Sequence, residues 1–214
     1  MTFTVAEGIT VEFSPGLMYW DGDSFEFESS QTEFSSTWNE NHVNHFSWSK
    51  DANVAVAETY DGTGRATADT FFTNKSGFTV NGQTGWRTLS KDEWSYLLKT
   101  RVVNGGTGYG KTCKWGAYSG VNGLIIAHDD YTGDFSDAAA AVEVDGCVFL
   151  PAAGHRLGTN VNLVIDLVGD YGLYWSATPL ESTVRDAYGL NFYDGLAGST
   201  YYSRPYGFCV RLVR

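Results

Sequence analysis

The chain has 214 residues, 43% of them hydrophobic, which is enough to bury a core as one large or two small domains, and we expect one. Its formal net charge of −11 disfavours nucleic acid and anionic lipid as partners, because both are themselves negatively charged. No apolar run approaches the roughly 20 residues that a membrane-spanning helix needs, so we expect a soluble domain without membrane insertion.

Aromatic residues and glycine dominate the composition. Seven Trp, 13 Tyr and 13 Phe accompany 25 Gly and only four Pro, which is typical of an aromatic-packed fold with many tight turns and little helix. Cys113, Cys147 and Cys209 are an odd number without CxxC spacing. We therefore expect buried, apolar cysteines rather than a disulfide framework or a zinc site.

The first 30 residues alternate between apolar and polar side chains, as in Phe3 and Val5 or Phe25 and Phe27, with "SPG" and "DGD" as turns. This pattern predicts short antiparallel strands. The stretch "TWNENHVNHFSWS", residues 37–49, is ambiguous and is compatible with one helical turn.

One helix is well marked, in "LSKDEWSYLLKTRV". Ser90 and Glu93 form a capping box, and Leu89 can pack against Trp94 across the helix start. We expect this helix to end before Gly105. Beyond it, frequent glycines exclude a helix, residues 131–146 read as a polar loop, and "CVFLP" reads as a short strand.

Strands separated by turns return from residue 171, in "YGLYWSAT", "AYGLNFYDG" and "GFCVRLVR". Leu190 and Phe192 alternate with Gly189, Asn191 and Tyr193, so every second side chain should face outward. The intervening "AGSTYYSRPYG", residues 197–207, reads as the connection and flank of these strands. Its Tyr, Ser and Gly are the residue types of adaptable binding surfaces. We expect one continuous exposed face that holds Arg185, Tyr193, Tyr201, Tyr202 and Tyr206.

A phosphate-binding loop is suggested by "GGTGYGKT", which matches GxxxxGK[ST] at Gly105–Thr112. Such a loop needs a strand before it and a helix after it, so that backbone N–H groups converge on the phosphates. Here a helix precedes the match and further glycines follow. We interpret the segment as a glycine-rich surface loop.

At the other candidate sites, the spacing of the residues matches no known metal-binding or catalytic motif well. The acidic residues Asp129, Asp130, Asp134 and Asp137 fit either a cation site or a solvated loop, but they lack the EF-hand pattern. His42 and His45 would serve zinc only on a helix with further ligands nearby. His155, in "PAAGHR", has no nucleophile or acid beside it in sequence. We expect no metal, no cofactor and no enzymatic activity.

Several segments together resemble a known family. "GWRTLSKDEWSYLL", "KWGAYSGVNGLII", "VFLPAAGHR", "GLYWSAT" and "GFCVRLVR" resemble the C-type-lectin-like domain shared by relatives of formylglycine-generating enzymes and by the variable proteins of diversity-generating retroelements. The resemblance implies an α+β, C-type-lectin-like fold of antiparallel strands with one or two helices. It covers one domain over residues 1–214, with a β-rich part at 1–79, a core at 80–214 and a variable region at about 171–214.

The variable-protein branch fits best, and it implies a scaffold that holds diversified positions. The implied scaffold residues are Trp175, Ser176, Ala187, Tyr188, Leu190, Phe192, Gly195, Arg204, Gly207, Val210 and Arg211. The implied ligand-binding positions are Leu180, Glu181, Val184, Arg185, Asp186, Gly189, Asn191, Tyr193, Asp194, Leu196, Tyr201, Tyr202, Ser203, Pro205, Tyr206 and Phe208.

The resemblance implies a receptor or adhesin that binds a protein or another cell-surface molecule, displayed on a cell or a virion. The sequence lacks the Glu-Pro-Asn type of loop found in calcium-dependent sugar-binding lectins. Cys209 stands alone where formylglycine-generating enzymes use a cysteine pair. Two alternatives stay open: an enzyme on the same fold with a pocket near His155 or Cys209, and a structural tail or pilus module.

Overall fold

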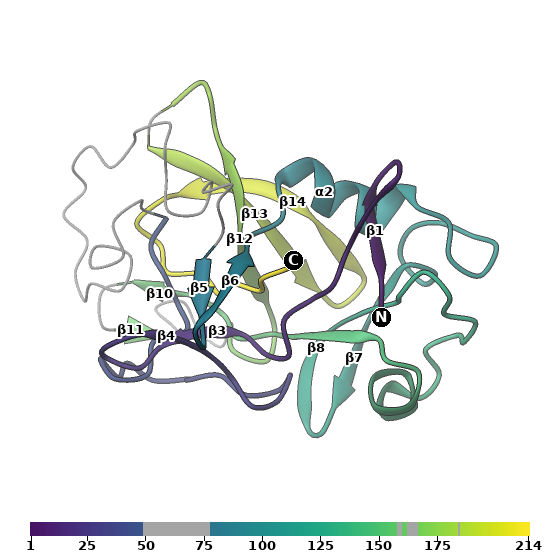
Figure 1. Ribbon diagram of the computed structural model, residues 1–214, viewed down its shortest axis with the longest axis horizontal. Helices are drawn as coiled ribbons and strands as arrows, with labels where there is room; N and C mark the ends of the chain where they lie inside the picture. Colours follow the sequence, from purple (N-terminus) through teal and green to yellow (C-terminus); the bar gives the residue numbers. More distant parts are fainter. Residues whose placement is uncertain (49–77, 158–159, 162–166, 184) are drawn as a thin grey trace.

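The computed structural model, drawn in Figure 1, describes residues 1–48, 78–157, 160–161, 167–183 and 185–214. In these ranges the chain forms short β-strands and one short α-helix, and every pairing between named strands is antiparallel. The predicted β-rich α+β class is therefore confirmed.

The N-terminal part of the described chain contains three short hairpins, and the two within the first 30 residues lie where the alternating pattern predicts strands. The paired strands are β1 (Phe3–Ala6) with β2 (Ile9–Val11), β3 (Met18–Trp20) with β4 (Phe25–Phe27), and β5 (Phe78–Val80) with β6 (Gln83–Trp86). Residues 37–48 contain no helical turn. Instead, the His42 N–H donates to the Asn39 carbonyl oxygen in a tight turn, after which Val43 bridges Trp20 and Phe46 bridges Phe208.

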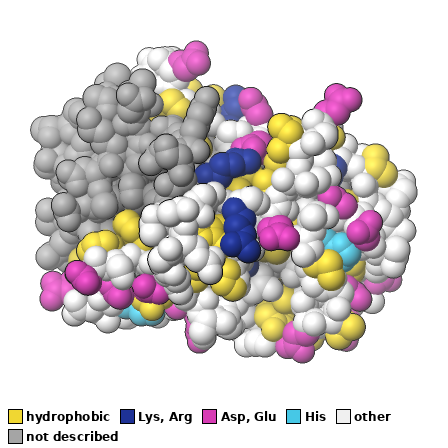
Figure 2. Space-filling view, in the orientation of Figure 1, with side chains coloured by type: hydrophobic (Ala, Val, Ile, Leu, Met, Phe, Trp, Pro, Cys, Tyr) yellow, Lys and Arg dark blue, Asp and Glu magenta, His cyan; other side chains and the backbone are white. Residues whose placement is uncertain are grey.

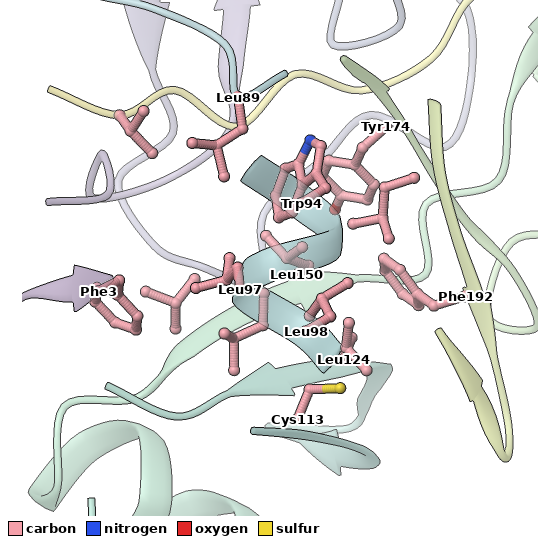
Figure 3. Close-up of a cluster of buried hydrophobic side chains, with 14 of the residues drawn as sticks. Phe3, Leu89, Trp94, Leu97, Leu98, Cys113, Leu124, Leu150, Tyr174 and Phe192 are labelled. Atoms are coloured by element: carbon pink, nitrogen blue, oxygen red, sulfur yellow. The ribbon is translucent and has the colours of Figure 1, made fainter. Parts of the chain in front are cut away.

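Helix α2 (Lys91–Ser95) begins where its capping box predicts. Ser90 Oγ accepts a hydrogen bond from the Glu93 N–H at 3.1 Å, and Glu93 Oε2 accepts one from the Ser90 N–H at 2.7 Å. The chain then continues in a π-helical turn, η2 (Tyr96–Thr100). Figure 3 shows Trp94, Leu97 and Leu98 reaching from these turns into the core.

A three-stranded sheet follows, with β7 (Cys113–Tyr118), β8 (Val121–Ile126) and β9 (Val148–Pro151) in that order. Between β8 and β9 lies a π-helical turn, η3 (Ala140–Val144), so the prediction of a continuous polar loop over 131–146 is wrong in part. Asp137 Oδ1 accepts a hydrogen bond from the Ala140 N–H at 3.0 Å. This cap and the alanine run after it favour the helical turn.

The C-terminal sheet has the order β12 (Gly172–Pro179), β13 (Asp186–Tyr193), β14 (Leu196–Ser203), and a small hairpin of β10 (Arg156–Leu157) and β11 (Asn160–Val161) precedes it. Residues 197–203 are thus a strand rather than a connection. The last predicted strand, residues 207–214, has no ladder of its own.

Residues 207–214 instead pair with several other elements, each through a single β-bridge. Phe208 bridges Phe46, Cys209 bridges Tyr174, and Val213 bridges both Phe13 and Arg87. In Figure 1 the C-terminus accordingly lies near the middle of the molecule. The end of the chain joins the N-terminal hairpins to the C-terminal sheet.

Hydrophobic clusters cover both faces of the C-terminal sheet. On one face Tyr174 and Phe192 pack with Trp94 of α2, and Figure 3 shows these rings around the helix. On the other face Trp175 and Phe208 belong to a second cluster. The residues expected to form the scaffold are buried, apart from half-buried Tyr188 and the exposed Gly195, and the buried ones are Trp175, Ser176, Ala187, Leu190, Phe192, Arg204, Gly207, Val210 and Arg211.

Candidate functional site

Along each strand of the C-terminal sheet, the side chains point alternately to one face and to the other. Residues opposite one another on paired strands share a face, and neighbours along a strand alternate. Tyr188 is opposite Tyr201, and Ala187 is opposite Tyr202. Tyr188 and Tyr201 therefore lie on the α2 side, while Tyr202 lies with Ala187 on the side of the second cluster.

This alternation corrects the expectation of one continuous face. Tyr201 and Tyr202 are adjacent in β14, so they point to opposite sides of the sheet. Tyr201 is 56% exposed and its ring lies 6.3 Å from that of Tyr188. Lys91 Nζ of α2 in turn sits 4.6 Å from the Tyr188 ring. Tyr193, Tyr201, Tyr202, Tyr206 and Arg185 do not form a single face.

The predicted ligand-binding positions divide into three classes of burial. The exposed ones are Glu181, Arg185, Asp194, Leu196 and Tyr201; the half-buried ones are Leu180, Asp186, Asn191, Tyr193, Tyr202, Ser203 and Tyr206; the buried ones are Gly189, Pro205 and Phe208. Val184 lies outside the described residues.

Phe208 was expected to face outward, and that expectation is wrong. Its side chain is 1% exposed, and its ring stacks on Trp175 with centroids 4.2 Å apart. Its backbone pairs with Phe46, a residue far away in sequence. That partner fixes Phe208 between the sheet and the N-terminal segment.

Gly189 and Pro205 are also buried rather than outward. A Cβ atom at Gly189 would lie 2.9 Å from the Tyr174 carbonyl oxygen and 3.5 Å from the Phe208 ring. Pro205 accepts a hydrogen bond on its carbonyl oxygen from Ser47 Oγ at 3.2 Å. Strand alternation predicted open space at Gly189, but the second cluster fills it.

An aromatic cleft opens on the second-cluster side of the sheet. Its volume is ≈ 290 Å³, and its lining residues are His155, Leu167, Tyr171, Leu173, Tyr202, Tyr206 and Phe208. The Tyr206 ring lies parallel to Phe208 at 6.2 Å, and the Tyr202 ring meets Phe208 edge-on at 4.9 Å. We call this site the aromatic cleft.

Among the described residues that line the aromatic cleft there is no Asp, Glu, Lys or Arg. Burial lowers the pKa of His155, so its imidazole is neutral at pH 7, and burial raises the pKa of Tyr202 to about 12, although the Asn191 side chain hydrogen-bonds to it. His155 is 7% exposed, and its Nδ1 atom is buried with no hydrogen-bond partner in the described part of the chain. Polar binding capacity in this cleft thus comes from neutral groups.

Sequence reasoning named Tyr202, Tyr206 and Phe208 as binding positions and placed a pocket near His155 only under the alternative of an enzyme. It did not assign Leu167 or Tyr171 to a site. His155 precedes the C-terminal sheet by more than a strand length and meets Tyr206 only through the fold, with ring centroids 5.5 Å apart. Tyr171 packs its ring on Tyr193 at 4.9 Å. No local spacing signals either contact.

The phosphate-loop match has the context that sequence analysis expected. Strand β7, not a helix, follows Gly105–Thr112. Thr112 is buried and its hydroxyl donates to the Leu98 carbonyl oxygen, whereas Lys111 is exposed. The loop therefore has no following helix N-terminus to hold a phosphate.

The acidic residues after β8 are engaged in local structure. Asp129 accepts hydrogen bonds from the Thr4 hydroxyl at 2.8 Å and from Arg101 at 2.8 Å. Asp134 and Asp137 accept backbone N–H groups of the turns that follow them. Throughout the described ranges, no three side chains of His, Cys, Asp or Glu are grouped so that they could hold a metal ion.

The two histidines of "HVNH" point to different partners. His42 Nε2 lies 2.6 Å from Glu28 Oε1, and His45 Nε2 lies 2.9 Å from the Ala153 carbonyl oxygen. The three cysteines are free and buried, as predicted. Burial raises the pKa of the Cys209 thiol beside the second cluster.

Figure 2 shows one face of the molecule, on which acidic side chains are scattered around the periphery and basic ones lie nearer the centre. Among the described helical segments, none has the length and apolar character that crossing a lipid bilayer demands.

Comparison with known proteins gives one match. A family model described as "Domain of unknown function (DUF8237)" matches residues 134–213. Neither the curated proteins nor the solved structures contain a match to the chain. The matched region includes the whole C-terminal sheet and every residue that lines the aromatic cleft.

Proposed function

We propose that this chain is a ligand-binding protein of the receptor or adhesin type, which presents a variable surface on a C-type-lectin-like scaffold. The observation that carries the proposal is the division of residues 171–214 into a buried framework and accessible tyrosines. The framework residues pack on both faces of the sheet, and the tyrosines from the same segment surround the aromatic cleft or lie on its edge strand.

The framework is held in part by hydrogen bonds that do not involve the side chains of the exposed positions. Trp175 Nε1 donates to the Phe46 carbonyl oxygen at 2.6 Å, and Trp48 Nε1 donates to the Ser176 carbonyl oxygen at 2.8 Å. Arg204 lies with its guanidinium 4.1 Å from the Trp48 ring. Substitutions at exposed positions leave these contacts in place, which is what a diversified surface requires.

The accessible residue types suit binding to a protein or another cell-surface molecule. Tyr and Arg are the residues that most often dominate interface energies, and Tyr201 and Arg185 are both exposed. Leu196 adds an exposed apolar side chain at the start of β14. These residues present apolar area beside polar groups that can adapt to a ligand.

The test is deep sequencing of the 3′ end of the gene from a population of cells that carry it, together with the flanking DNA. We expect a nearby template repeat and substitutions confined to its adenines. These substitutions should fall in codons of exposed positions such as Glu181, Arg185 and Tyr201. Codons of Trp175 and Phe192 serve as the matched control and should stay constant. Equal variation in both sets, or a population with no variation and no template repeat, contradicts the proposal.

A further inference from the structure

The aromatic cleft has a composition that selects ligand chemistry. Its walls are rings and leucines, and its polar atoms are the hydroxyl groups of Tyr171, Tyr202 and Tyr206 and the imidazole of His155. Each of these groups has both an apolar body and a polar tip. A ligand that fits must therefore offer an apolar body and few polar groups.

Size sets the first limit on the ligand. An enclosed apolar cavity of about 150 Å³ is enough to bind benzene. The aromatic cleft, at ≈ 290 Å³, has room for one or two fused rings. Larger ligands could place one ring in the cleft and leave the remainder outside.

Charge sets the second limit. None of the described lining residues is charged, so a charged group inside the cleft would lose hydration without gaining an opposite charge from any of them. The chain as a whole carries a net charge of −11, which further disfavours anions. The ligand group inside the cleft is therefore neutral.

Hydrogen bonding sets the third limit. His155 is almost completely buried and its Nδ1 has no partner among the described residues, which is uncommon because buried polar groups are usually paired. A neutral imidazole offers one donor and one acceptor. A sugar ring would need partners for several hydroxyls, whereas the lining residues that the structure describes include no carboxylate and no side-chain amide.

We propose that the aromatic cleft binds a neutral aromatic ring with one hydrogen-bonding substituent, a phenol or an indole, which stacks among Tyr202, Tyr206 and Phe208 and hydrogen-bonds to His155. Such a ring occurs as a free small molecule and as the side chain of Tyr or Trp on a partner protein. This inference rests on the proposed function, because it assigns a ligand class to the same C-terminal surface.

The experiment titrates the full chain with 4-methylphenol, toluene, indole and methyl glucoside by isothermal titration calorimetry. We expect 4-methylphenol to bind about tenfold more tightly than toluene, since only the phenol can hydrogen-bond to the imidazole. In His155→Phe the two ligands should bind with about equal affinity, because the hydrogen bond is lost while the ring can still bind. His42→Phe is the matched control, because His42 contacts Glu28 and is not among the residues that line the cleft, so its loss should change no affinity.

A second measurement uses the unaltered protein, in case His155→Phe does not fold. Histidine side chains labelled with ¹⁵N are followed by NMR during titration with 4-methylphenol. The His155 signals should shift with the ligand, whereas those of His42 and His45, which bond to Glu28 and Ala153, should not. Saturation transfer to free tyrosine amide and to a peptide with one Tyr separates the small-molecule source from the protein source.

Three outcomes overturn the inference: no ring binds, toluene equals 4-methylphenol in the unaltered protein, or methyl glucoside binds more tightly than both. None of these outcomes affects the codon test, which concerns where variation falls. Confined codon variation without ring binding leaves the proposed function standing and removes only the ligand class. Ring binding without such codon variation supports the ligand class and contradicts the proposed function.

Discussion

Phe208 and Tyr201 show how neighbouring aromatic residues of one segment acquire different roles. Tyr201 belongs to the tyrosine-rich stretch 197–207, and Phe208 follows directly after that stretch, in the predicted last strand. Phe208 is enclosed by Trp175, Tyr202 and Tyr206, whereas Tyr201 contacts Tyr188 and is otherwise open to solvent. At the scale of residues, the contacts a ring makes decide whether it contributes to stability or is available for binding.

Substitution of these rings should separate the two roles. Tyr201→Ala should change the free energy of unfolding by no more than about 0.5 kcal/mol, as for ordinary surface positions. Trp175→Ala should cost about 3 to 5 kcal/mol, through lost burial and the cavity left behind. Urea denaturation measures both. If Tyr201→Ala were as costly as Trp175→Ala, the tyrosine would be part of the packing and not of the surface.

Tyr202 and Tyr206 should behave between these limits, because each is half-buried against Phe208. A position on the outward side of a strand therefore does not by itself make a tyrosine irrelevant to stability. Alternation along a strand identifies which side chains share a face of the sheet. It does not reveal that a residue brought from elsewhere, here Phe208, covers that side.

Gly172 offers a test of close packing at the start of β12. A Cβ atom there would lie 1.9 Å from Phe192 Cζ, so Gly172→Ala should destabilise the fold by about 1 to 3 kcal/mol through overpacking. Phe192→Leu shortens the opposing side chain and should relieve part of that cost. A double-mutant cycle in urea gives the coupling between the two positions. Strict additivity of the two changes would show that the Phe192 ring is not what excludes a side chain at residue 172.

At the scale of elements, helix α2 was predictable and strand β14 was not. The α2 start depends on local signals, since Ser90, Glu93 and Leu89 all lie within one turn. β14 consists largely of Gly, Ser, Thr and Tyr, which favour loops as readily as strands, and it is a strand because β13 offers it a complete ladder. Tertiary pairing therefore overrides composition in the segment that matters most for binding.

The start of α2 also makes stability depend on pH. Burial alone would raise the pKa of Glu93, but hydrogen bonds from Arg87 and from the Ser90 N–H outweigh it, and the pKa lies below its ordinary value of 4.5. A carboxyl with a lowered folded-state pKa contributes stability above its unfolded pKa, and this contribution is lost as the pH falls through the folded pKa.

Glu93→Gln should therefore destabilise the protein at neutral pH and have a smaller effect in acid. Urea denaturation of both proteins between pH ~7 and pH ~3 measures the difference. The gap between the two curves should begin to narrow near pH 4.5, the ordinary pKa of the group, and continue to close below it. A gap that stays constant over this range would mean that the charge of Glu93 contributes nothing beyond its hydrogen bonds.

At the scale of the whole molecule, the two faces of the C-terminal sheet bring together distant parts of the chain. Phe46 and Trp48 come from the N-terminal third, and His155 comes from the segment before β10. The fold class and the burial of the cysteines were predictable because they depend on composition and local alternation. The aromatic cleft was not, since its walls meet only after long-range packing.

The three buried cysteines report on opening of the whole molecule. Burial raises the pKa of Cys113 to about 11 and that of Cys147 to about 12, so little reactive thiolate exists at neutral pH. A thiol reagent such as DTNB should label none of the three within the time that unfolded protein is fully labelled, and should label all three in urea. Rapid labelling of one cysteine in native buffer would identify a part of the fold that opens separately.

The central position of residues 207–214 has a consequence for protein synthesis. The carbonyl oxygens of Val210, Leu212 and Arg214 accept hydrogen bonds from the backbone N–H groups of Met18, Ser14 and Glu12, so segments about 190 to 200 residues apart, one translated well before the other, pair with each other. While the ribosome is still adding these residues, the N-terminal hairpins lack these backbone partners, and part of their hydrophobic surface stays open to solvent. Folding must then wait for contacts of very high sequence separation, which slows it. We expect nascent chains of this domain to depend on chaperones that hold hydrophobic surface until residues 207–214 leave the exit tunnel.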